Sequence, residues 1–414
     1  LLLTIVFLFI SFYISRKLEN ISIEYLNIID DETLNIINKF NKNDISNKGK
    51  EFFGYGTPIV NFTDVFHNRS IISNNLKGKV SLSSDEISNY NVKEGDIFFT
   101  RTSETINEIG YPSVMTDSPV NTVFSGFVLR ARAIDLDPLA LSFKQYVFFT
   151  DIFRSEMVKK SSMTTRALTS GTAIKQMLFT FPKDKNEQTK IGNYFQQLDK
   201  LIEQKENKYQ KLKQFKKAML DKMFPKNGAN TPEIRFKGFS GKWAEKALEE
   251  IVDRYDNLRI PISASNRIAG DTPYYGANGI QDYVQGFTHD GEFILVAEDG
   301  ANDLKNYPVQ YVNGKIWVNN HAHVLQAKKD ISSNKFLKYS ISKINIEPFL
   351  VGGGRAKLNA NIMMKINIYV PLDIQEQEKI GNYFQKLDNQ IDLQQKELEK
   401  LKNIKKASLA KMFV

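Results

Sequence analysis

Two stretches decide the fold because they are copies of one another. Residues 187–224 read EQTKIGNYFQQLDKLIEQKENKYQKLKQFKKAMLDKMF, and residues 376–413 read EQEKIGNYFQKLDNQIDLQQKELEKLKNIKKASLAKMF. The copies lie 189 residues apart without a gap, and 22 of their 38 positions are identical. A repeat of this length predicts two similar halves, each a globular segment followed by the repeated stretch.

Both copies have the spacing of a long amphipathic helix. Apolar residues recur every three or four positions, a pattern typical of a coiled-coil seam. At about 1.5 Å per residue, each copy would form a rod of roughly 57 Å. We therefore expect two long helices that each carry such a seam. The predicted seam residues are Phe195, Leu198, Ile202, Leu212, Phe384, Leu387, Ile391, Leu398 and Leu401.

Each copy interrupts the seam at one equivalent polar position, Lys205 or Gln394. If the helices pack antiparallel, these two residues share one layer near the middle of the seam. A single polar layer fixes register and partner orientation at some cost in stability. The alternative is that both side chains extend to water.

The composition is that of a globular protein with more than one domain. The 414 residues include no cysteine, which excludes disulfide bonds and thiolate metal sites and fits a reducing compartment. We accordingly expect a cytoplasmic protein. The formal net charge of +9 permits nucleic-acid binding, and a lysine-rich solvated surface is the alternative.

The chain divides into six segments. They are an apolar N-terminal segment at 1–16, a globular domain at 17–184, a long helix at 185–224, a linker at 225–242, a second globular domain at 243–373 and a second long helix at 374–414. Short apolar runs punctuated by Gly and Pro predict an α+β fold for both domains. The expected architecture is two mixed α/β domains on two antiparallel helices, with a pseudo-two-fold repeat.

Several elements inside the two domains can be predicted. Strands are expected at 96–100, 122–130, 293–296, 315–318 and 366–370, and a helix within 139–160. The apolar run at 1–14 is shorter than the roughly 20 residues of a membrane span and lacks the preceding positive charge of a secretory signal. We interpret it as a truncated or misplaced start, with a short anchor or a core strand as alternatives.

Catalytic motifs are mostly missing from the sequence. Gly314-Lys315 lacks the glycine spacing and the Ser/Thr of a Walker motif. Residues 52–56, FFGYG, fit a methyl-donor pattern without its partner motif, so we expect a loop turn there. His321 and His323 alternate on a predicted strand, and we favour packing or hydrogen bonding over a metal site. We expect neither a catalytic residue nor a bound metal.

Polar and basic residues in predicted loops are candidates for nucleic-acid contact. The sequence GGGR at 352–355, followed by Lys357, could cradle a phosphate, with a flexible loop as the alternative. Arg355 has a counterpart in Arg166 at the 189-residue offset. The predicted DNA-binding residues are Arg101, Thr102, Ser103, Arg166, Tyr274, Tyr275, Asn278, Arg355 and Lys357.

The repeated IGNYF-Q-x-LD helices, each preceded by Pro and Glu-Gln, resemble the specificity subunit of type I restriction–modification systems. Residues 231–243, 273–283, 294–302 and 317–325 also resemble segments of that family's recognition domains. The resemblance covers nearly the whole chain after the first 15 or so residues. One departure is that the leader TPEIRFKGFSGKW at 231–243 precedes the second domain but not the first.

The resemblance implies a non-catalytic subunit that binds double-stranded DNA. Each domain would be a target recognition domain that reads one half of a split DNA sequence. The helices would hold the half-sites apart and bind two methyltransferase subunits, and a motor-endonuclease subunit would join them. The methyl donor, ATP and magnesium would serve these partners, and no membrane would be involved. The rival hypotheses are a coiled-coil protein–protein scaffold without DNA contact, and a fused enzyme.

Overall fold

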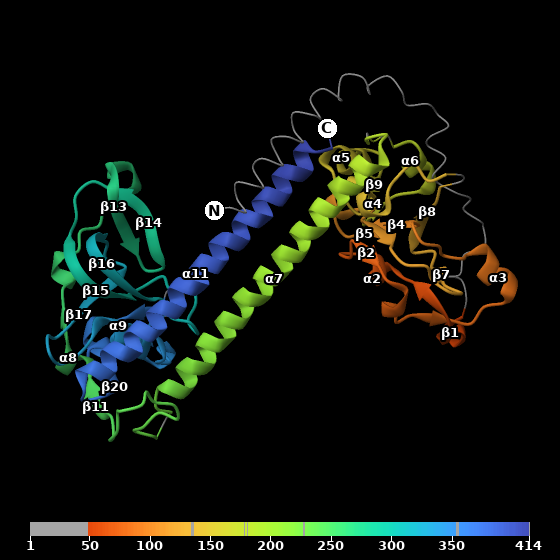
Figure 1. Ribbon diagram of the computed structural model, residues 1–414. Helices are drawn as coiled ribbons and strands as arrows, with labels where there is room; N and C mark the ends of the chain where they lie inside the picture. The colour runs from red at the N-terminus through yellow and green to blue at the C-terminus, as the bar shows by residue number, and fades with distance from the viewer. Residues whose placement is uncertain are drawn as a thin grey trace. The chain divides into compact units, whose positions relative to one another are not determined.

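The computed structural model describes residues 49–133, 136–177, 179, 181–226, 228–352 and 356–413. The chain forms two compact units, one made of Leu1–Gln204 with Leu398–Val414 and the other of Lys205–Glu397. We call these unit 1 and unit 2. Each contains one globular domain and a part of both long helices (Figure 1). The predicted apolar segment at 1–16 lies outside the described residues.

Both repeated stretches are unbroken helices. Helix α7 spans Lys185–Met223 and helix α11 spans Ile374–Lys411. Each begins after an aspartate whose Oδ1 accepts a hydrogen bond from a backbone N–H of the first turn, Asp184 for α7 and Asp373 for α11. All nine predicted seam residues are buried or half-buried.

The two helices pack antiparallel within each unit. The side-chain contacts pair Tyr194 with Ser408 and Asp199 with Lys405 in unit 1, and Tyr209 with Gln395 and Lys216 with Asp388 in unit 2. As the residue number rises along α7, the number of its partner on α11 falls. The predicted antiparallel arrangement is therefore confirmed.

The two polar seam positions share one layer in unit 2. Lys205 Nζ and Gln394 Nε2 both donate to Oε2 of Glu397, the latter over 3.3 Å. Lys205 is thus held by a partner on the other helix rather than only by water. That the layer fixes the register of the helices stays a prediction.

The domain of unit 1 is built on a four-stranded sheet in the order β2-β6-β4-β8. These strands span Ser70–Ile71 (β2), Pro112–Met115 (β6), Ile97–Thr100 (β4) and Val128–Ala131 (β8). Smaller sheets join β3 (Lys79–Val80), β1 (Phe53–Val60) and β7 (Val123–Phe124), and β5 (Thr102–Ser103), β10 (Ala167–Leu168) and β9 (Ser162–Met163). Its helices are α2 (Phe62–Val65), α3 (Ser84–Asn89), α4 (Leu141–Val147), α5 (Asp151–Lys159) and α6 (Gly171–Lys175).

The domain of unit 2 is built on a six-stranded sheet in the order β12-β17-β15-β16-β13-β14. These strands span Val252–Arg254 (β12), Ala322–Ala327 (β17), His289–Ala297 (β15), Val309–Val318 (β16), Ala269–Gly276 (β13) and Gly279–Val284 (β14). Two pairs complete it, β11 (Ala244–Ala247) with β20 (Asn367–Val370) and β18 (Leu350–Val351) with β19 (Lys357–Leu358). Its helices are α8 (Leu248–Ile251), α9 (Asn334–Ser342) and α10 (Ala360–Met363).

The two domains share a strand core that their sequences barely reveal. In unit 1, β2 runs parallel to β6, while β4 is antiparallel to both β6 and β8. In unit 2, β13 runs parallel to β16, while β15 is antiparallel to both β16 and β17. The order and directions β2-β6-β4-β8 thus match β13-β16-β15-β17. Figure 1 shows the two sheets, each beside its own domain's helices.

Most predicted elements are confirmed, and two are corrected. The strands expected at 96–100, 293–296, 315–318 and 366–370 fall in β4, β15, β16 and β20. The strand expected at 122–130 is two short strands, because a turn closed by Val128 N–H on the Ser125 carbonyl separates them. The helix expected within 139–160 is two helices, since Thr150 caps a new one through its hydroxyl.

A glycine in each repeat lets the long helix approach its domain closely. A Cβ added at Gly192 would lie 2.4 Å from the carbonyl carbon of Ser142, beside α4. One added at Gly381 would lie 2.7 Å from the backbone nitrogen of Phe336 in α9. Both distances are too short for a real Cβ, so the shared glycine allows the same docking in both units.

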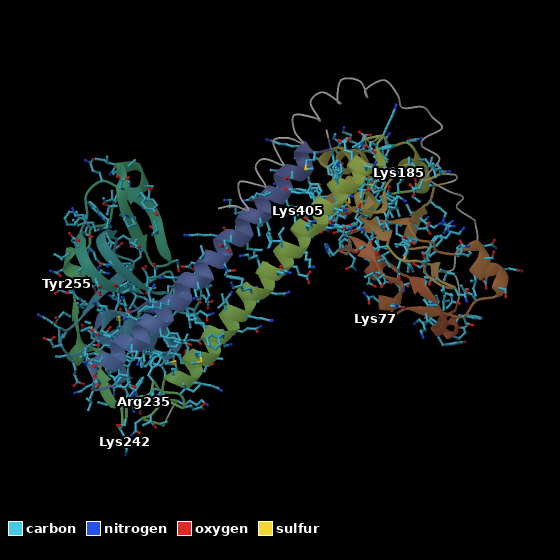
Figure 2. The ribbon with its side chains drawn as sticks, viewed as in Figure 1. Lys77, Lys185, Arg235, Lys242, Tyr255 and Lys405 are labelled. Atoms are coloured by element: carbon cyan, nitrogen blue, oxygen red, sulfur yellow. The ribbon has the colours of Figure 1, made fainter. Side chains whose placement is uncertain are left out.

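The repeated aspartate of the LD pair joins three elements in each unit. Asp199 accepts from the Tyr146 hydroxyl of α4 over 3.0 Å and pairs with Lys405 of α11, which is labelled in Figure 2. Asp388 accepts from the Tyr339 hydroxyl of α9 over 2.8 Å and pairs with Lys216 of α7.

The charge of Asp388 is stabilised by its lysine partners. Burial alone would raise the pKa of Asp388, but Lys338 and Lys216 lower it below its ordinary value. The carboxylate therefore stays charged and holds the domain and both helices together. Removing one of these partners would leave an uncompensated charge on a half-buried carboxylate, which is strongly destabilising.

A phenylalanine after each long helix enters the core of the other helix's domain. Phe413, beyond α11, packs its ring 5.2 Å from that of Phe143 in unit 1. Phe224, beyond α7, packs 5.6 Å from Phe336 in unit 2. The end of α11 thus completes the core of the first domain, and the end of α7 completes the core of the second.

Replacing Phe413 by alanine should destabilise unit 1 selectively. Its side chain is buried, so the loss should be about 3–5 kcal/mol of unfolding free energy. We expect faster amide hydrogen exchange in α4 and in the first half of α7, with the sheet of unit 2 unchanged.

The matched control is Phe224→Ala, which should give the reverse pattern. Equal loosening of both units by either variant would contradict this assignment of the two phenylalanines.

Candidate nucleic-acid interface

A short hairpin projects from the first domain. Strands β9 and β10 pair antiparallel, with Ala167 opposite Met163 and Leu168 opposite Ser162. Strand β10 also pairs with β5, so the hairpin is attached to the domain along one side. We call residues 162–168 the hairpin and Met163, Thr164 and Thr165 the hairpin tip.

The hairpin presents nearly all its side chains to solvent. Ala167 is buried and anchors it, whereas the other six residues are exposed, including Met163 at 50% and Leu168 at 43%. The hydroxyls of Ser162, Thr164 and Thr165 form no hydrogen bond with another described residue. Residues 159–175, KKSSMTTRALTSGTAIK, contain four cationic side chains and no Asp or Glu. This combination of cations and hydroxyls suits a polyanion.

The structure brings the predicted residues of the first domain together. The backbone N–H of Thr169, next to the hairpin, donates to the carbonyl of Arg101 over 3.1 Å. Arg101 is exposed, and Thr102 is half-buried in β5. Arg166 lies in the hairpin and pairs with Glu104 over 3.0 Å, and both side chains are more than 60% exposed.

Ser103 does not fit the predicted role. Its side chain is buried, and its Oγ accepts a hydrogen bond from the backbone N–H of Thr105 over 3.2 Å. The prediction that Ser103 contacts DNA is therefore corrected, because its hydroxyl shapes the turn after β5. The sequence placed it near Arg101 but could not show that tertiary contacts bury its side chain.

Tyr274 is also a structural residue. It is 1% exposed, and its hydroxyl donates to the carbonyl of Ile262 over 3.3 Å while accepting from the backbone N–H of the same residue over 3.1 Å. The guanidinium of Arg267 covers its ring at 4.2 Å. The prediction that Tyr274 contacts DNA is corrected, because its ring and hydroxyl are both used inside the domain.

The neighbours of Tyr274 are partly accessible. Tyr275 is half-buried, and burial raises the pKa of its hydroxyl. Asn278 is exposed, but its Nδ2 donates to the carbonyl of Gly300 and its Oδ1 accepts from the N–H of Asn302, each over 2.9 Å. Asn278 therefore ties two loops together. That Tyr275 and Asn278 contact DNA stays a prediction.

The second domain has an equivalent of the hairpin's framework. The backbone N–H of Leu358 donates to the carbonyl of Glu298 over 2.7 Å, and Leu358 matches Thr169 at the 189-residue offset. Lys357 Nζ lies 2.9 Å from a carboxylate oxygen of Glu298, so part of its charge is neutralised within the domain. Arg355 lies outside the described residues.

An ionic cluster lies beneath this framework. His323 is buried, with Nδ1 2.7 Å from Asp256 Oδ2 and Nε2 2.8 Å from the Leu358 carbonyl. Asp256, Glu298 and His323 place ligand-type atoms within 4.8 Å of one another. The geometry alone would therefore admit a metal ion.

The charges around the cluster argue against that use. Arg259 Nη1 lies 2.7 Å from Glu298 Oε2, and Arg259 Nη2 lies 3.5 Å from Asp256 Oδ2. Burial alone would raise the pKa of Glu298, but hydrogen bonds from Arg259 and Lys357 lower it. A metal would have to displace a guanidinium already in place. The hydrogen-bonding alternative for His323 is thus confirmed, as it also is for His321, which pairs with Asp299.

The FFGYG sequence at 52–56 is neither a cofactor loop nor a simple turn. Its last four residues begin strand β1, whose pairing with β3 shifts register between Phe53 and Thr57. At Gly56 the backbone φ is 91°, and a Cβ there would lie 2.8 Å from the Val80 carbonyl oxygen. The expectation of a loop turn is corrected to a bulged strand that needs this glycine.

The exposed hairpin tip is not among the residues that the sequence predicts. Met163, Thr164 and Thr165 belong to no motif, and alternation is not visible in strands of two residues. The available signal was the acid-free stretch at 159–175.

Among the described helices, none combines the length and apolarity that crossing a membrane requires.

Replacing His323 by alanine should loosen the framework of the second domain. The change removes two hydrogen bonds of a buried ring and should cost about 1–3 kcal/mol of unfolding free energy. We expect faster hydrogen exchange at the Leu358 amide, and a smaller effect from the matched control His321→Ala. Zinc or manganese added to the unaltered chain should leave its melting temperature unchanged. A rise that grows with metal concentration would contradict the ionic assignment.

Comparisons with known proteins find sequence matches of one kind. The sequence profile of the type I restriction modification DNA specificity domain matches residues 240–403. A Haemophilus influenzae protein described as a type I restriction enzyme specificity subunit is 44% identical over 146 residues. The EcoprrI type I restriction enzyme specificity subunit of Escherichia coli is 26% identical over 116 residues. These matches span 35% and 28% of this chain, and 37% and 28% of the relatives' own lengths.

The fold extends the likeness to most of the chain. The crystal structure of a type I restriction–modification S subunit from M. genitalium aligns with a TM-score of 0.62 at 16% identity. The alignment covers 91% of this chain and 98% of that structure, so the two folds are shared nearly throughout. The chain is thus similar to type I restriction–modification specificity subunits, in sequence over residues 240–403 and in fold over most of its length.

Proposed function

We propose that this chain is the DNA-binding specificity subunit of a type I restriction–modification complex. Each globular domain reads one half of a bipartite sequence in double-stranded DNA. The long helices α7 and α11 set the spacing of the halves and dock two methyltransferase subunits. The match of residues 240–403 to the type I restriction modification DNA specificity domain and the duplicated architecture support this proposal.

The observation that carries the proposal is a common frame with unlike surfaces. Both domains share the same strand core and dock on their helices through an equivalent glycine and aspartate. At matching places the side-chain chemistry differs, since the exposed Arg101 stands where the second domain has the buried Glu298 within an ionic cluster. Two unlike surfaces on one frame suit two different half-sites.

The proposed subunit is non-catalytic and works through partners. The methyl donor, ATP and magnesium serve the methyltransferase subunits and a motor-endonuclease subunit, and the complex acts in the cytoplasm. The scaffold without DNA contact is the alternative function. A scaffold of that kind would not bind DNA. A DNA-binding subunit releases counterions when it contacts phosphates, so its DNA affinity would fall steeply as the salt concentration rises.

Domain exchange provides the direct test. The chain is co-expressed with the methyltransferase subunit of its system, and methylated bases in the host DNA are mapped. We expect a split motif with two unlike halves. Replacing residues 17–184 by the first domain of another specificity subunit should change one half only, because the second domain is untouched.

The exchanged domain has to keep a phenylalanine at 143 and a tyrosine at 146, because Phe413 and Asp199 contact them. A motif that changes in both halves would contradict modular reading. A soluble assembled complex that methylates nothing would contradict the function itself.

Lengthening both helices should widen the gap between the half-sites. Seven residues inserted after Lys211 and seven after Asp392 preserve the heptad seam and keep the antiparallel pairs matched on both sides. The insertion adds about 10 Å of helix, or about three base pairs of DNA. Motif mapping should give the same bases with a longer gap. An unchanged gap would mean that the helices do not set the spacing.

A further inference from the structure

We propose that the hairpin at residues 162–168 is the element of the first domain that enters a DNA groove. In this assignment Arg166 binds a backbone phosphate, and the hairpin tip (Met163, Thr164 and Thr165) faces the base edges. The proposal rests on the proposed function, which it deepens by naming the reading element.

The shape and exposure of the hairpin suit a groove. A two-stranded antiparallel ribbon is one of the two protein elements that fit the major groove of B-form DNA. Strands β9 and β10 form such a ribbon, and β5 supports it from one side only. Met163 and Leu168 are exposed, and a partner that fully buried them would gain about 1.5–3 kcal/mol for each side chain.

The residues that attach the hairpin to the domain are held by burial and by hydrogen bonds within the domain. Ala167 is fully buried, and Thr169 is buried with its hydroxyl on the sulfur of Met157 at 3.7 Å. Ser170 accepts from the N–H of Ala173 over 3.1 Å and caps α6. The hydroxyls of Thr169 and Ser170 are therefore used within the domain. Those of the hairpin's exposed residues have no partner among the described residues, so they are available to a ligand.

A comparison of the two halves of the repeat shows which parts of the hairpin region are common to both domains and which differ. In the second domain, β19 and α10 begin 190 and 189 residues after β10 and α6. Between the strands, the first domain has SMTTR at 162–166 and the second has VGGGR at 351–355. The arginine is common to both sequences and the preceding residues differ.

This pattern assigns two roles. A feature common to every DNA sequence is the phosphate backbone, so the common arginine suits a phosphate. Residues that differ between two readers of different half-sites suit the bases. Threonine hydroxyls can bond to any base edge, and a methionine methyl group can pack against the methyl group of thymine.

The ion pair of Arg166 with Glu104 does not prevent this use. Both side chains are largely exposed, and exposed pairs contribute at most about 1 kcal/mol. The guanidinium can therefore exchange the carboxylate for a phosphate. In the absence of DNA, Glu104 holds the Arg166 side chain through this ion pair. The negative charge of Glu104 lowers the affinity of the hairpin for any polyanion.

Two variants of the full chain test the assignment within the assembled methyltransferase complex. One is Arg166→Gln. The other replaces residues 162–165 by the Val-Gly-Gly-Gly of residues 351–354, which removes the side chains of the tip and keeps Arg166. The matched control is Lys226→Gln, which breaks another exposed ion pair, that of Lys226 with Glu233. Each complex is used to map methylated motifs and to titrate a duplex that carries the wild-type motif at several salt concentrations.

The two variants should behave differently. Arg166→Gln should weaken binding about equally for all sequences and reduce the salt slope of log K by about 0.9, with the motif unchanged. The tip replacement should leave the salt slope unchanged and relax one or two base positions of one half-site by about 10–100-fold. Glu104→Gln should raise affinity for all sequences. The control should alter neither quantity.

Other outcomes would overturn the assignment. A motif altered by Arg166→Gln at one base would make Arg166 a base reader instead of a phosphate contact. A tip replacement that folds, assembles and preserves the full motif would remove the hairpin from the interface. The unaltered complex and the second half-site report separately on the proposed function. If the unaltered complex methylates a split motif, a negative result for the hairpin concerns the hairpin alone.

Discussion

The packing of each helix's terminal phenylalanine into the other domain's core is the interaction on which the rest of the structure depends. Phe224 and Phe413 close the chain on itself, since each domain is followed by a helix that ends in the core of the other domain's unit. The equivalent glycines and aspartates then hold each domain against both helices. Neither domain has a complete core without a segment from the other half of the sequence.

This arrangement explains why the helices have stayed alike while the domains have diverged. A helix residue such as Asp199 or Asp388 must satisfy a tyrosine on one side and a lysine of the other helix on the other side. Such a position tolerates little change, because an unpaired buried carboxylate is costly. The exposed residues of the hairpin bear no such constraint. The sequence repeat therefore distinguishes internal contact surfaces, which are alike in the two halves, from outward-facing surfaces, which differ.

Much of the architecture could be predicted from the sequence, because long helices carry a strong periodic signal. The seam and its interruption at Lys205 and Gln394 follow from that period, and the shared layer of these two residues follows once the helices are antiparallel. The common strand core was invisible, since strands of two to four residues show no alternation. For the candidate site, residue type alone grouped Arg101 with Arg166 but could not show that Ser103 and Tyr274 are buried. Burial depends on tertiary contacts that the local sequence does not encode.

Because each domain's core includes the end of the helix that follows the other domain, the two cores are completed at different times during synthesis. The segment that completes the second domain, the end of α7, leaves the ribosome before that domain is made. The segment that completes the first domain, Leu409 to Phe413, is made after every other described part of the chain. The first domain must therefore wait, with Phe143 and Phe195 uncovered, while about 190 further residues are translated. At roughly 5–20 residues per second this interval lasts about 10–40 seconds, in which a chaperone or a second nascent chain has access to the uncovered core.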